Sequence, residues 1–458
     1  MIDLELRIHS LMRGGILPMN EFSTSLLGIP DRDMLGLNEF EKNNIQYYDV
    51  TLANHGGRCP QCGAFVKKVK EYRLKHIDHA VLIKKKGIIL YHARRFQCPK
   101  CGTTFYEKNP FIEDYEKISS QTEENVLKLL KDYNQTFSSA ARATGMSKTK
   151  AMQIFDEHVQ IPRKNLTETI CIDEFYFSRT ARKKFALMIL NFKNGAVLDI
   201  LSSREKHRLL SYFHAIPRAE RERVHYVSID MNDVYRDTVK QCFPNAVLCV
   251  DSFHVMENLS RALDDVRLRI MRRYEDRRSD EYYLLKYQKQ LLFRDIEPDA
   301  YHRVKVNHHF RYAVTDQRKL EMMLAISTEL KSAFYLKEEY TLFNQTQEKD
   351  PDELRKMLEN LADEFLASEI PEMVSISLML KNWEEEILNS FQTIEDKGKT
   401  RRISNGPIEG RNKLIKILLR LANGYENFDR FRNRAIYVLN KMEQPSSVRL
   451  KNTVKHYR

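Results

Sequence analysis

The stretch that decides the fold reads Ile170-Cys-Ile-Asp-Glu-Phe175, then Phe185-Ala-Leu-Met-Ile-Leu-Asn-Phe192, Lys193-Asn-Gly195 and Ala196-Val-Leu-Asp-Ile-Leu201. Asn-Gly between two apolar runs is the strongest short-range signal of a β-hairpin. Helical and strand patterns then alternate, and they cover residues 205–215 (helix), 224–230 (strand), 234–243 (helix) and 246–251 (strand). The stretch therefore predicts an α/β unit with three strands, a helix, a strand, a helix and a strand.

Carboxylates mark this unit and one distant helix. Asp173 lies in the first strand, while Asp230 and Asp251 end the two later strands, where ligand sites gather in open sheets. Glu409 follows an Asn-Gly-Pro turn and begins a pattern with the apolar residues Ile408, Ile415, Leu418 and Leu419 at helical spacing. Several carboxylate oxygens are needed to hold two divalent cations, which together promote displacement at phosphorus. Asp173 and its neighbour Glu174 face opposite sides of a strand, and Asp251 is an alternative to Asp230.

Six short segments are distinctive in combination. They are Cys171-Ile-Asp-Glu-Phe175, Asp230-Met-Asn-Asp-Val-Tyr235, Phe243-Pro-Asn-Ala246, Asp251-Ser-Phe-His-Val255, Asn405-Gly-Pro-Ile-Glu-Gly-Arg-Asn412 and Gly424-Tyr-Glu-Asn-Phe428. Together they resemble the bacterial insertion-sequence transposases of the ISL-three family. The order of elements likewise resembles a ribonuclease H-like fold. The resemblance implies a triad of Asp173, Asp230 and Glu409 that binds two Mg²⁺ (or Mn²⁺) ions. Asp251 and His254 match an Asp-x-x-His signature and are expected to support the triad.

The resemblance also implies an activity and its partners. A transposase of this kind binds the terminal inverted repeats of its element, cleaves the strand with water, and joins the freed 3′ hydroxyl to target DNA. A homo-oligomer on paired DNA ends is expected. Two alternatives stay open: a nuclease of the same fold that cuts without joining, and a DNA-binding regulator derived from a transposase.

Composition agrees with a protein that binds nucleic acid. The chain has 458 residues, enough for two to four domains, and its formal net charge of +12 favours a polyanionic partner. No apolar run is long enough to span a membrane, and the first residues lack a secretory signal, so a cytoplasmic protein is expected. Seven cysteines, four of them in two close pairs, argue against a disulfide framework.

The two close pairs predict a zinc ribbon. Cys59-Pro-Gln-Cys62-Gly63 and Cys98-Pro-Lys-Cys101-Gly102 are tight knuckles, and four thiolates suit a tetrahedral structural Zn²⁺. His55, His76, His79 and His92 are alternative ligands, which the four cysteines make unnecessary. The many lysines and arginines between the knuckles form either a solvated face or a phosphate-binding one.

Residues 118–160 predict a helix-turn-helix. Ala140 and Ala141 permit close helix packing, Gly145 provides the turn, and Ser147 can cap the next helix. That helix presents Lys148, Thr149, Lys150 and Gln153, a polar and basic set expected to contact DNA. A small helical bundle without DNA contacts would show the same pattern.

Long charged segments with apolar residues at helical spacing follow Asp251, over 255–274, 280–292, 316–335, 351–367 and 371–391. Trp383 lies among them and is expected to pack in a core, with stacking on a flipped base as the alternative. Beyond them Arg411, Lys413 and Lys416 gather around Glu409 and are expected to contact DNA.

The predicted organisation has six parts. They are a leader and lead-in (1–50, with Met19 as an alternative start), the zinc ribbon (51–115), the helix-turn-helix domain (118–160), a ribonuclease H-like catalytic core in two pieces (167–260 and 400–442), a helical insertion (261–399) and a basic tail (443–458).

Overall fold

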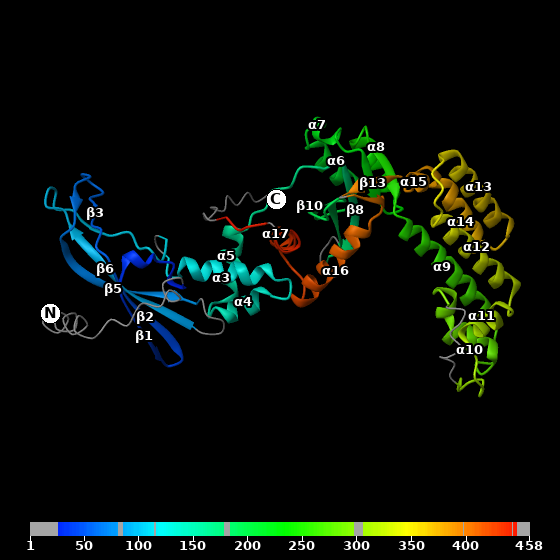
Figure 1. Cartoon of the computed structure of the whole chain (residues 1–458), viewed down its shortest axis with the longest axis horizontal. Helices are drawn as coiled ribbons and strands as arrows, with labels where there is room; N and C mark the ends of the chain where they lie inside the picture. Colours follow the sequence, from blue (N-terminus) through cyan, green and yellow to red (C-terminus); the bar gives the residue numbers. More distant parts are fainter. Residues whose placement is uncertain are drawn as a thin grey trace. The chain divides into compact units, whose positions relative to one another are not determined.

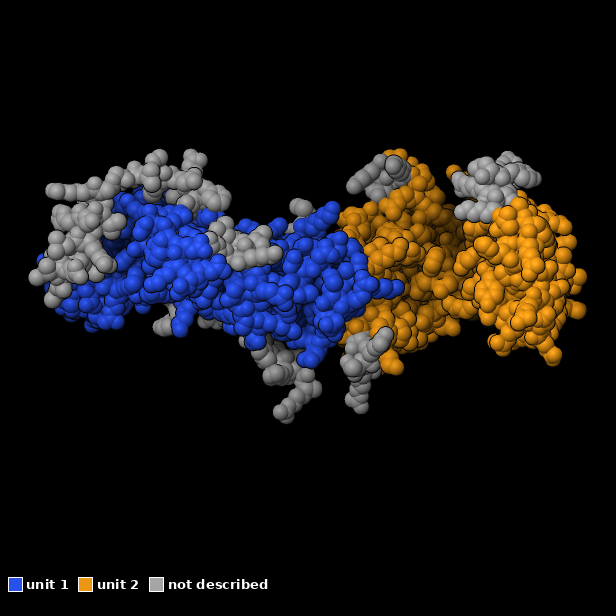
Figure 2. All heavy atoms as spheres, turned by 90° about the horizontal axis from the view of Figure 1, so that it is seen from below, with its two compact units in different colours: residues 1–162, 414–458 blue, residues 163–413 orange. Residues whose placement is uncertain are grey.

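The computed structural model describes residues 26–80, 86–113, 116–177, 184–296, 306–396, 398–441 and 443–446. The chain divides into two compact units, coloured in Figure 2: unit 1 comprises residues 1–162 and 414–458, and unit 2 comprises residues 163–413. Both alternative starts, Met1 and Met19, and most of the predicted basic tail lie outside the described residues. Within the described part, no helix combines the length and apolar character needed to cross a bilayer.

A mixed sheet forms the centre of unit 2. Its strands are β8 (Thr169–Tyr176), β9 (Phe185–Asn191), β10 (Val197–Leu201), β11 (Tyr226–Ile229) and β12 (Val247–Val250). They lie in the order β10-β9-β8-β11-β12, with β8, β9 and β10 antiparallel in turn and β11 parallel to both β8 and β12. The predicted hairpin is confirmed, and Gly195 takes the left-handed conformation (φ 67°) that its turn requires. The α/β class and the order of these elements follow the sequence pattern.

Helices connect the later strands. They are α6 (Lys206–His214), α7 (Arg218–Arg221) and α8 (Asp233–Cys242). The side chain of Asn232 caps α8 by accepting from the backbone amide of Val234 at 2.9 Å. The strands are apolar on both faces, as expected where helices cover a sheet, and their side chains are almost all buried.

A helical region follows β12 in unit 2 (Figure 1). Its elements are α9 (Ser252–Met271), α10 (Asp280–Tyr287), η2 (Lys289–Leu292), α11 (Asp316–Leu324), α12 (Thr328–Asn344), α13 (Pro351–Ala367), α14 (Pro371–Asn382) and α15 (Glu384–Asn389). The pattern over 316–335 is divided between two helices rather than one, and the pattern over 371–391 breaks at Trp383. A short hairpin of β13 (Thr393–Asp396) and β14 (Lys399–Arg402) then leads to α16 (Gly406–Leu421).

Trp383 belongs to the core, as predicted. Its side chain is buried, and the guanidinium of Arg236 from α8 lies 3.4 Å from the ring centroid. Arg236 also donates to the backbone carbonyl of Asn382 at 2.9 Å. Because Arg236 occupies the ring face, Trp383 ties the helical region to α8, and the base-stacking alternative is not supported.

Unit 1 contains a second sheet, which carries the cysteine knuckles. Its strands are β1 (Met34–Lys42), β2 (Ile45–Leu52), β5 (Val69–His79), β6 (Lys86–Gln97) and β7 (Thr104–Tyr106). They lie in the order β1-β2-β6-β5, and β7 pairs with β6. A short 3-10 turn η1 (Asp31–Asp33) precedes β1, and the first knuckle lies between β3 (Gly57–Arg58) and β4 (Phe65–Val66). The sequence interpretation set residues 1–50 apart as a leader and lead-in, whereas β1 and most of β2 lie in that range and belong to the sheet that carries the knuckles.

A helical bundle completes unit 1. It consists of α3 (Ser120–Lys131), α4 (Phe137–Ala143), α5 (Lys148–His158) and α17 (Phe428–Leu439). The predicted turn at Gly145 (φ 67°) and the predicted cap are confirmed, since the hydroxyl of Ser147 accepts from the backbone amide of Lys150 at 3.1 Å.

The fourth helix of the bundle comes from the far end of the chain. The fully buried Arg434 of α17 donates to the backbone carbonyls of Asp132 and Gln135 at 2.9 and 3.0 Å. Lys131 returns the contact by donating to the carbonyl of Asn440 at 3.1 Å. The sequence interpretation grouped residues 400–442 with the catalytic core, whereas α17 packs on α3 of unit 1.

A buried histidine predicts an acid-sensitive unit 1. His79 is 2% exposed, its Nδ1 lies 2.8 Å from the Ser119 hydroxyl, and burial lowers its pKa to about 4. The unfolded chain, with an ordinary histidine pKa near 6.5, binds a proton that the folded state excludes, so stability is present above that pH and is lost as the pH falls toward 4. The expected loss between pH 7 and pH 5 is about 2 kcal/mol.

Denaturant titrations at the two pH values, monitored in unit 1 by hydrogen exchange, would measure this loss. His79→Asn retains a group that can bond to Ser119 but cannot titrate, so its pH dependence should be shallower. His207→Asn, at a histidine whose side chain is 75% exposed, should behave like the unmodified protein. An unchanged slope in His79→Asn would contradict the assignment.

Candidate active site

Three side chains from separate elements of unit 2 converge at the edge of the central sheet. Asp173 lies on β8, Asp230 directly follows β11, and His254 lies in the first turn of α9. One potential ligand atom from each lies within 4.8 Å of the others. β8 and β11 are neighbouring parallel strands in which Ser228 pairs with Cys171, so Asp230 lies beside Asp173 two residues further along each strand. We call these three residues the acid group.

Two asparagines connect the acid group to the start of α16. Asn412 donates its side-chain amide to Asp173 Oδ2 at 2.6 Å, and Asn405 donates to Asp230 Oδ1 at 3.2 Å. His254 Nε2 lies 2.6 Å from the same oxygen of Asp230. The carbonyl of Asn405 also accepts the backbone amide of Glu409 at 3.2 Å, so the residue that contacts Asp230 begins the helix that carries Glu409.

Burial and mutual repulsion shape the electrostatics of the acid group. Burial, together with the nearby charge of Asp230, raises the pKa of Asp173 to about 8. Burial opposes protonation of His254, but its hydrogen bond with Asp230 and the surrounding acids outweigh this effect and raise its pKa to about 9. The raised pKa of Asp173 means that a second carboxylate charge beside Asp230 is costly without further positive charge, which a divalent cation would supply.

Glu409 lies apart from the acid group. It occupies the first turn of α16, as predicted, yet its carboxylate is not among the ligand atoms within 4.8 Å of one another. Its negative charge raises the pKa of Asp251, although burial is the larger cause. The structure therefore brings together two members of the predicted triad, Asp173 and Asp230, and leaves the carboxylate of Glu409 outside that group.

The remaining acids near the site have structural partners. Glu174 accepts from Arg204 Nη1 at 2.7 Å and from the Tyr235 hydroxyl at 2.5 Å, so it does not join the acid group. Asp251 caps α9 by accepting from the backbone amide of Phe253 at 3.4 Å. Of the two alternatives for the second ligand, Asp230 is the one in the acid group. His254, expected behind the ligands, is itself a member.

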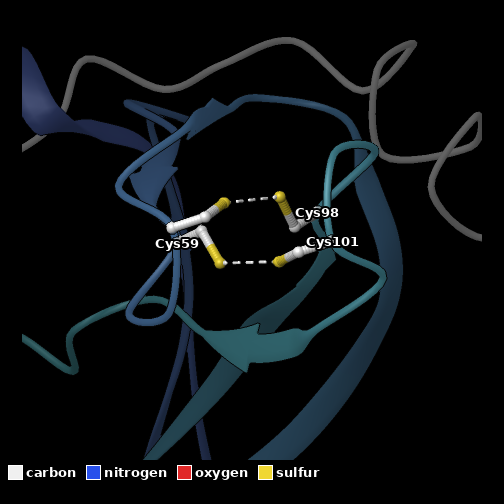
Figure 3. Close-up of side chains that lie close together, drawn as sticks. Cys59, Cys98 and Cys101 are labelled. Atoms are coloured by element: carbon white, nitrogen blue, oxygen red, sulfur yellow. Dashed lines mark hydrogen bonds between the residues drawn. The ribbon is translucent and has the colours of Figure 1, made fainter.

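The four predicted cysteines of unit 1 also converge. Figure 3 shows the sulfurs of Cys59, Cys98 and Cys101 directed toward one another, and Cys62 completes the group. The Cys59–Cys101 and Cys62–Cys98 sulfur distances are both 3.5 Å. Four sulfurs at about 2.3 Å from a tetrahedral zinc ion lie roughly 3.8 Å apart, so the donor set fits this ion.

The two cysteine knuckles have the same backbone geometry. The amide of Gly63 donates to the carbonyl of Cys59, and the amide of Gly102 donates to the carbonyl of Cys98, both at 2.9 Å. Both glycines are left-handed, with φ values of 71° and 75°. The Thr103 hydroxyl and backbone hydrogen-bond to Cys101 and lower the pKa of its thiol to about 6. Thiolate formation, which metal binding requires, is thereby favoured.

The alternative histidine ligands lie elsewhere. His55 pairs with Asp33 at 3.0 Å, and His92 pairs with Asp49 at 2.9 Å. His79 bonds to Ser119, and His76 is exposed on β5. These positions leave the cysteines as the metal-binding group of the module.

The residues expected to contact DNA fall in two places. In unit 1, Lys148, Thr149 and Gln153 are exposed on α5, while Lys150 Nζ lies 3.2 Å from a carboxylate oxygen of Glu116. On α16, Lys413 and Lys416 are exposed, and Arg411 Nε donates to the carbonyl of Gly195 at 2.9 Å. Arg411 is thus held against the β9–β10 turn of unit 2. Lys148, Thr149, Gln153, Lys413 and Lys416 are exposed to solvent, and Lys150 pairs with Glu116.

Sequence reasoning missed Asn405 and Asn412. Both lie in the quoted motif around Glu409, but they received no role. Asn405 precedes Gly-Pro at the start of a helix, where asparagine is a preferred cap, and Asn412 follows Glu409 by three residues, which places both on one helix face. Those spacings could have identified them as partners of the acids.

The sequence of the chain is similar to those of known proteins from one family. The sequence pattern of a transposase family, the DDE transposases of ISL-three type, matches residues 170–435. The transposase for insertion sequence element IS1001 of Bordetella parapertussis is 23% identical over 214 residues, which cover 46% of this chain and 52% of that protein. The transposase for IS1557 of Mycobacterium tuberculosis is 28% identical over 114 residues, a quarter of each chain. The chain thus spans about half of the first relative's length.

Proposed function

The chain belongs to the ISL-three family of insertion-sequence transposases, and on this premise we propose that it cleaves and joins DNA strands in a metal-dependent reaction at the acid group. Its substrates in this proposal are the terminal inverted repeats of its element and target DNA. The observation that carries the proposal is the convergence of Asp173, Asp230 and His254 at the edge of the central sheet. A homo-oligomer acting on paired DNA ends in the cytoplasm completes the scheme.

We infer that the centre of unit 2 is a ribonuclease H-like catalytic core. The strand order β10-β9-β8-β11-β12, with its single change from antiparallel to parallel pairing at β8 and β11, supports this assignment. The positions of Asp173 on the first strand and Asp230 after the fourth support it as well.

The donor set of the acid group fits divalent cations with oxygen ligands. Asp173 and Asp230, joined by Glu409 when α16 adjusts, would hold Mg²⁺ or Mn²⁺. Such ions would supply charge stabilisation at the phosphate that reacts. The chain's own contribution is orientation: Asn412 fixes one oxygen of Asp173, and Asn405 with His254 fixes one oxygen of Asp230.

The reaction consists of two displacements at phosphorus. In the first, a water oxygen bonds to phosphorus and the bond to the 3′ oxygen breaks, which frees a 3′ hydroxyl. In the second, that 3′ oxygen bonds to a phosphorus of target DNA and a target strand is broken. The first step consumes one water and one phosphodiester and leaves a 3′ hydroxyl and a 5′ phosphate. The second step exchanges one phosphodiester for another, with the 3′ oxygen of the target strand leaving as a hydroxyl, and neither step requires an oxidant or reductant.

Unit 1 is proposed to recognise the DNA ends. The α4–α5 pair would act as a helix-turn-helix whose exposed Lys148, Thr149 and Gln153 contact the duplex. The cysteine module would hold a structural Zn²⁺ ion and act as a zinc ribbon beside it. The affinity for DNA is expected to fall as salt concentration rises, because Lys148 and other basic side chains of unit 1 would neutralise phosphates.

Glu409→Gln is expected to lower Mg²⁺-dependent strand cleavage roughly a hundred- to thousandfold, the scale for removal of one electrostatic stabiliser. The reason is that the neutral amide keeps the size of the side chain but removes its charge. Gel assays with end-labelled DNA would measure the rate. Glu395→Gln, at an exposed acid of β13 in the same unit, is the matched control. Equal rates in both variants would show that Glu409 is not the third acid.

The proposal itself is tested with the unmodified protein, Mg²⁺ and labelled DNA that carries the element's own ends. Cleaved and joined products would support a transposase. Cleavage without joining would favour the nuclease, and binding without cleavage would favour the regulator.

A further inference from the structure

A basic groove adjoins the acid group in unit 2. It encloses about 590 Å³ between the β9–β10 turn and the first two turns of α16. Its lining includes three cations, Lys193, Arg401 and Arg411, and contains no acidic residue. Arg411 is fixed by its bond to Gly195, and the guanidinium of Arg401 lies over the Phe192 ring at 4.8 Å from its centroid. The groove is therefore a prepared positive surface, not a chance gathering of mobile side chains.

The chain itself links this groove to the acids. Ser404 lines the groove, and the next residue, Asn405, bonds to Asp230. Arg411 lines the groove, and the next residue, Asn412, bonds to Asp173. Successive residues of one segment thus contact the groove and the acid group. The β9–β10 turn lies beside the start of β8, where Asn191 pairs with Ile170, so the groove begins roughly 10 Å along the strand from Asp173.

Gly410 supplies an independent observation. It lies inside α16 with ordinary helical backbone, where glycine is the poorest helix former apart from proline. A Cβ atom added there would meet nothing within 4 Å, so packing in the described structure does not require glycine. Gly410 lines the groove. Glycine without a steric or conformational reason is typical of a place where a ligand approaches the backbone closely.

We propose that this groove binds the phosphodiester backbone of the DNA strand that reacts, with Arg401 and Arg411 against its phosphates and Gly410 in direct contact with it. The proposal rests on the proposed function and deepens it, because it gives the strand a path into the acid group. Arginines suit phosphates through paired hydrogen bonds, and the open helix surface at Gly410 gives the sugar-phosphate chain room.

Substitution at Gly410 separates this role from a structural one. Gly410→Ala and Gly410→Leu should leave the melting temperature unchanged or raise it, because both residues favour the helix and the space is empty. They should nevertheless raise the DNA concentration for half-maximal cleavage, by about tenfold for leucine, the scale of one lost charge-assisted contact, and by less for alanine. A lowered melting temperature with unchanged DNA dependence would overturn the proposal.

Crosslinking tests the groove without relying on activity. Gly410→Cys is incubated with DNA that carries a thiol tether on one phosphate at a time, and Glu395→Cys is the exposed control in the same unit. A mixed disulfide confined to phosphates next to the cleaved bond, and absent in the control, is expected. Equal crosslinking of both variants would refute the groove. If the Gly410→Cys protein crosslinks as expected but the unmodified protein never cleaves DNA, the groove stands and the proposed function fails.

Discussion

Asp230→Asn is expected to lower Mg²⁺-dependent DNA cleavage by at least about a thousandfold. Asp230 is the centre of the acid group, since one of its oxygens meets both His254 at 2.6 Å and Asn405 at 3.2 Å. The amide preserves size and removes the charge that a divalent cation requires, which costs several kcal/mol of transition-state stabilisation. Single-turnover cleavage of end-labelled DNA measures the effect.

DNA binding by the Asp230→Asn protein should remain within about threefold of the original value, because the residue is not part of the basic surfaces. Asp237→Asn, at an exposed acid that pairs with Lys206 in the same unit, provides the matched control and should cleave normally. A second readout does not depend on cleavage. The pKa of His254 should fall from about 9 when its charged partner is lost, and NMR titration of the imidazole would detect this. Retained cleavage in Asp230→Asn would refute the assignment of the acid group.

Cys98→Ser is expected to unfold the part of unit 1 around the two knuckles, with the strands β3, β4 and β7, while unit 2 remains folded. Cys98 is buried, and its sulfur lies 3.5 Å from that of Cys62. Loss of one of four thiolates removes much of the binding energy of a structural zinc ion, whose apparent scale is about 10 to 16 kcal/mol. The small buried cluster at the knuckles, formed by Cys59, Cys98, Val66 and Phe96, cannot replace it, whereas the rest of the sheet has its own larger cluster that includes Ile77, Ile89 and Tyr91.

Metal analysis of the purified protein should find one zinc ion per chain in the original protein and none in Cys98→Ser. Hydrogen exchange should become rapid in β3, β4 and β7, which flank the knuckles, and protection in β8 and β11 should be unchanged. Lys100→Ser, at an exposed residue between Cys98 and Cys101, should retain both zinc and protection. The absence of zinc from the original protein, or a full zinc content in Cys98→Ser, would contradict the zinc assignment.

Signals confined to a few neighbouring residues were readable from the sequence. The Asn194-Gly195 turn, the two cysteine knuckles and the Ser147 cap each depend on local backbone chemistry, and each is present in the structure. The convergence of Asp173 and Asp230 was expected only from the family resemblance, because no local pattern reports the parallel pairing of β8 with β11 that brings them together.

Contacts between distant segments were not readable in the same way. The bonds of Asn405 and Asn412 to the acids join residues 175 and 239 positions apart, and no periodicity reports such a pairing. Residues 34–52 alternate like any exposed strand, so nothing local assigns them to the sheet of the cysteine module. The position of the Glu409 carboxylate outside the acid group depends on how its side chain is placed in three dimensions, and no local sequence pattern predicts that placement.

The return of α17 to the helical bundle has a consequence for the order in which the protein matures during synthesis. The hydrogen bonds from Arg434, Tyr437 and Lys131 that fasten α17 to α3 and its following loop join residues 299 to 312 positions apart. A ribosome has therefore made α3, α4 and α5 long before it makes the helix that completes them. Until then the nascent chain carries an unfinished bundle, and full DNA recognition should appear only once the acid group and its helix α16 have also been made.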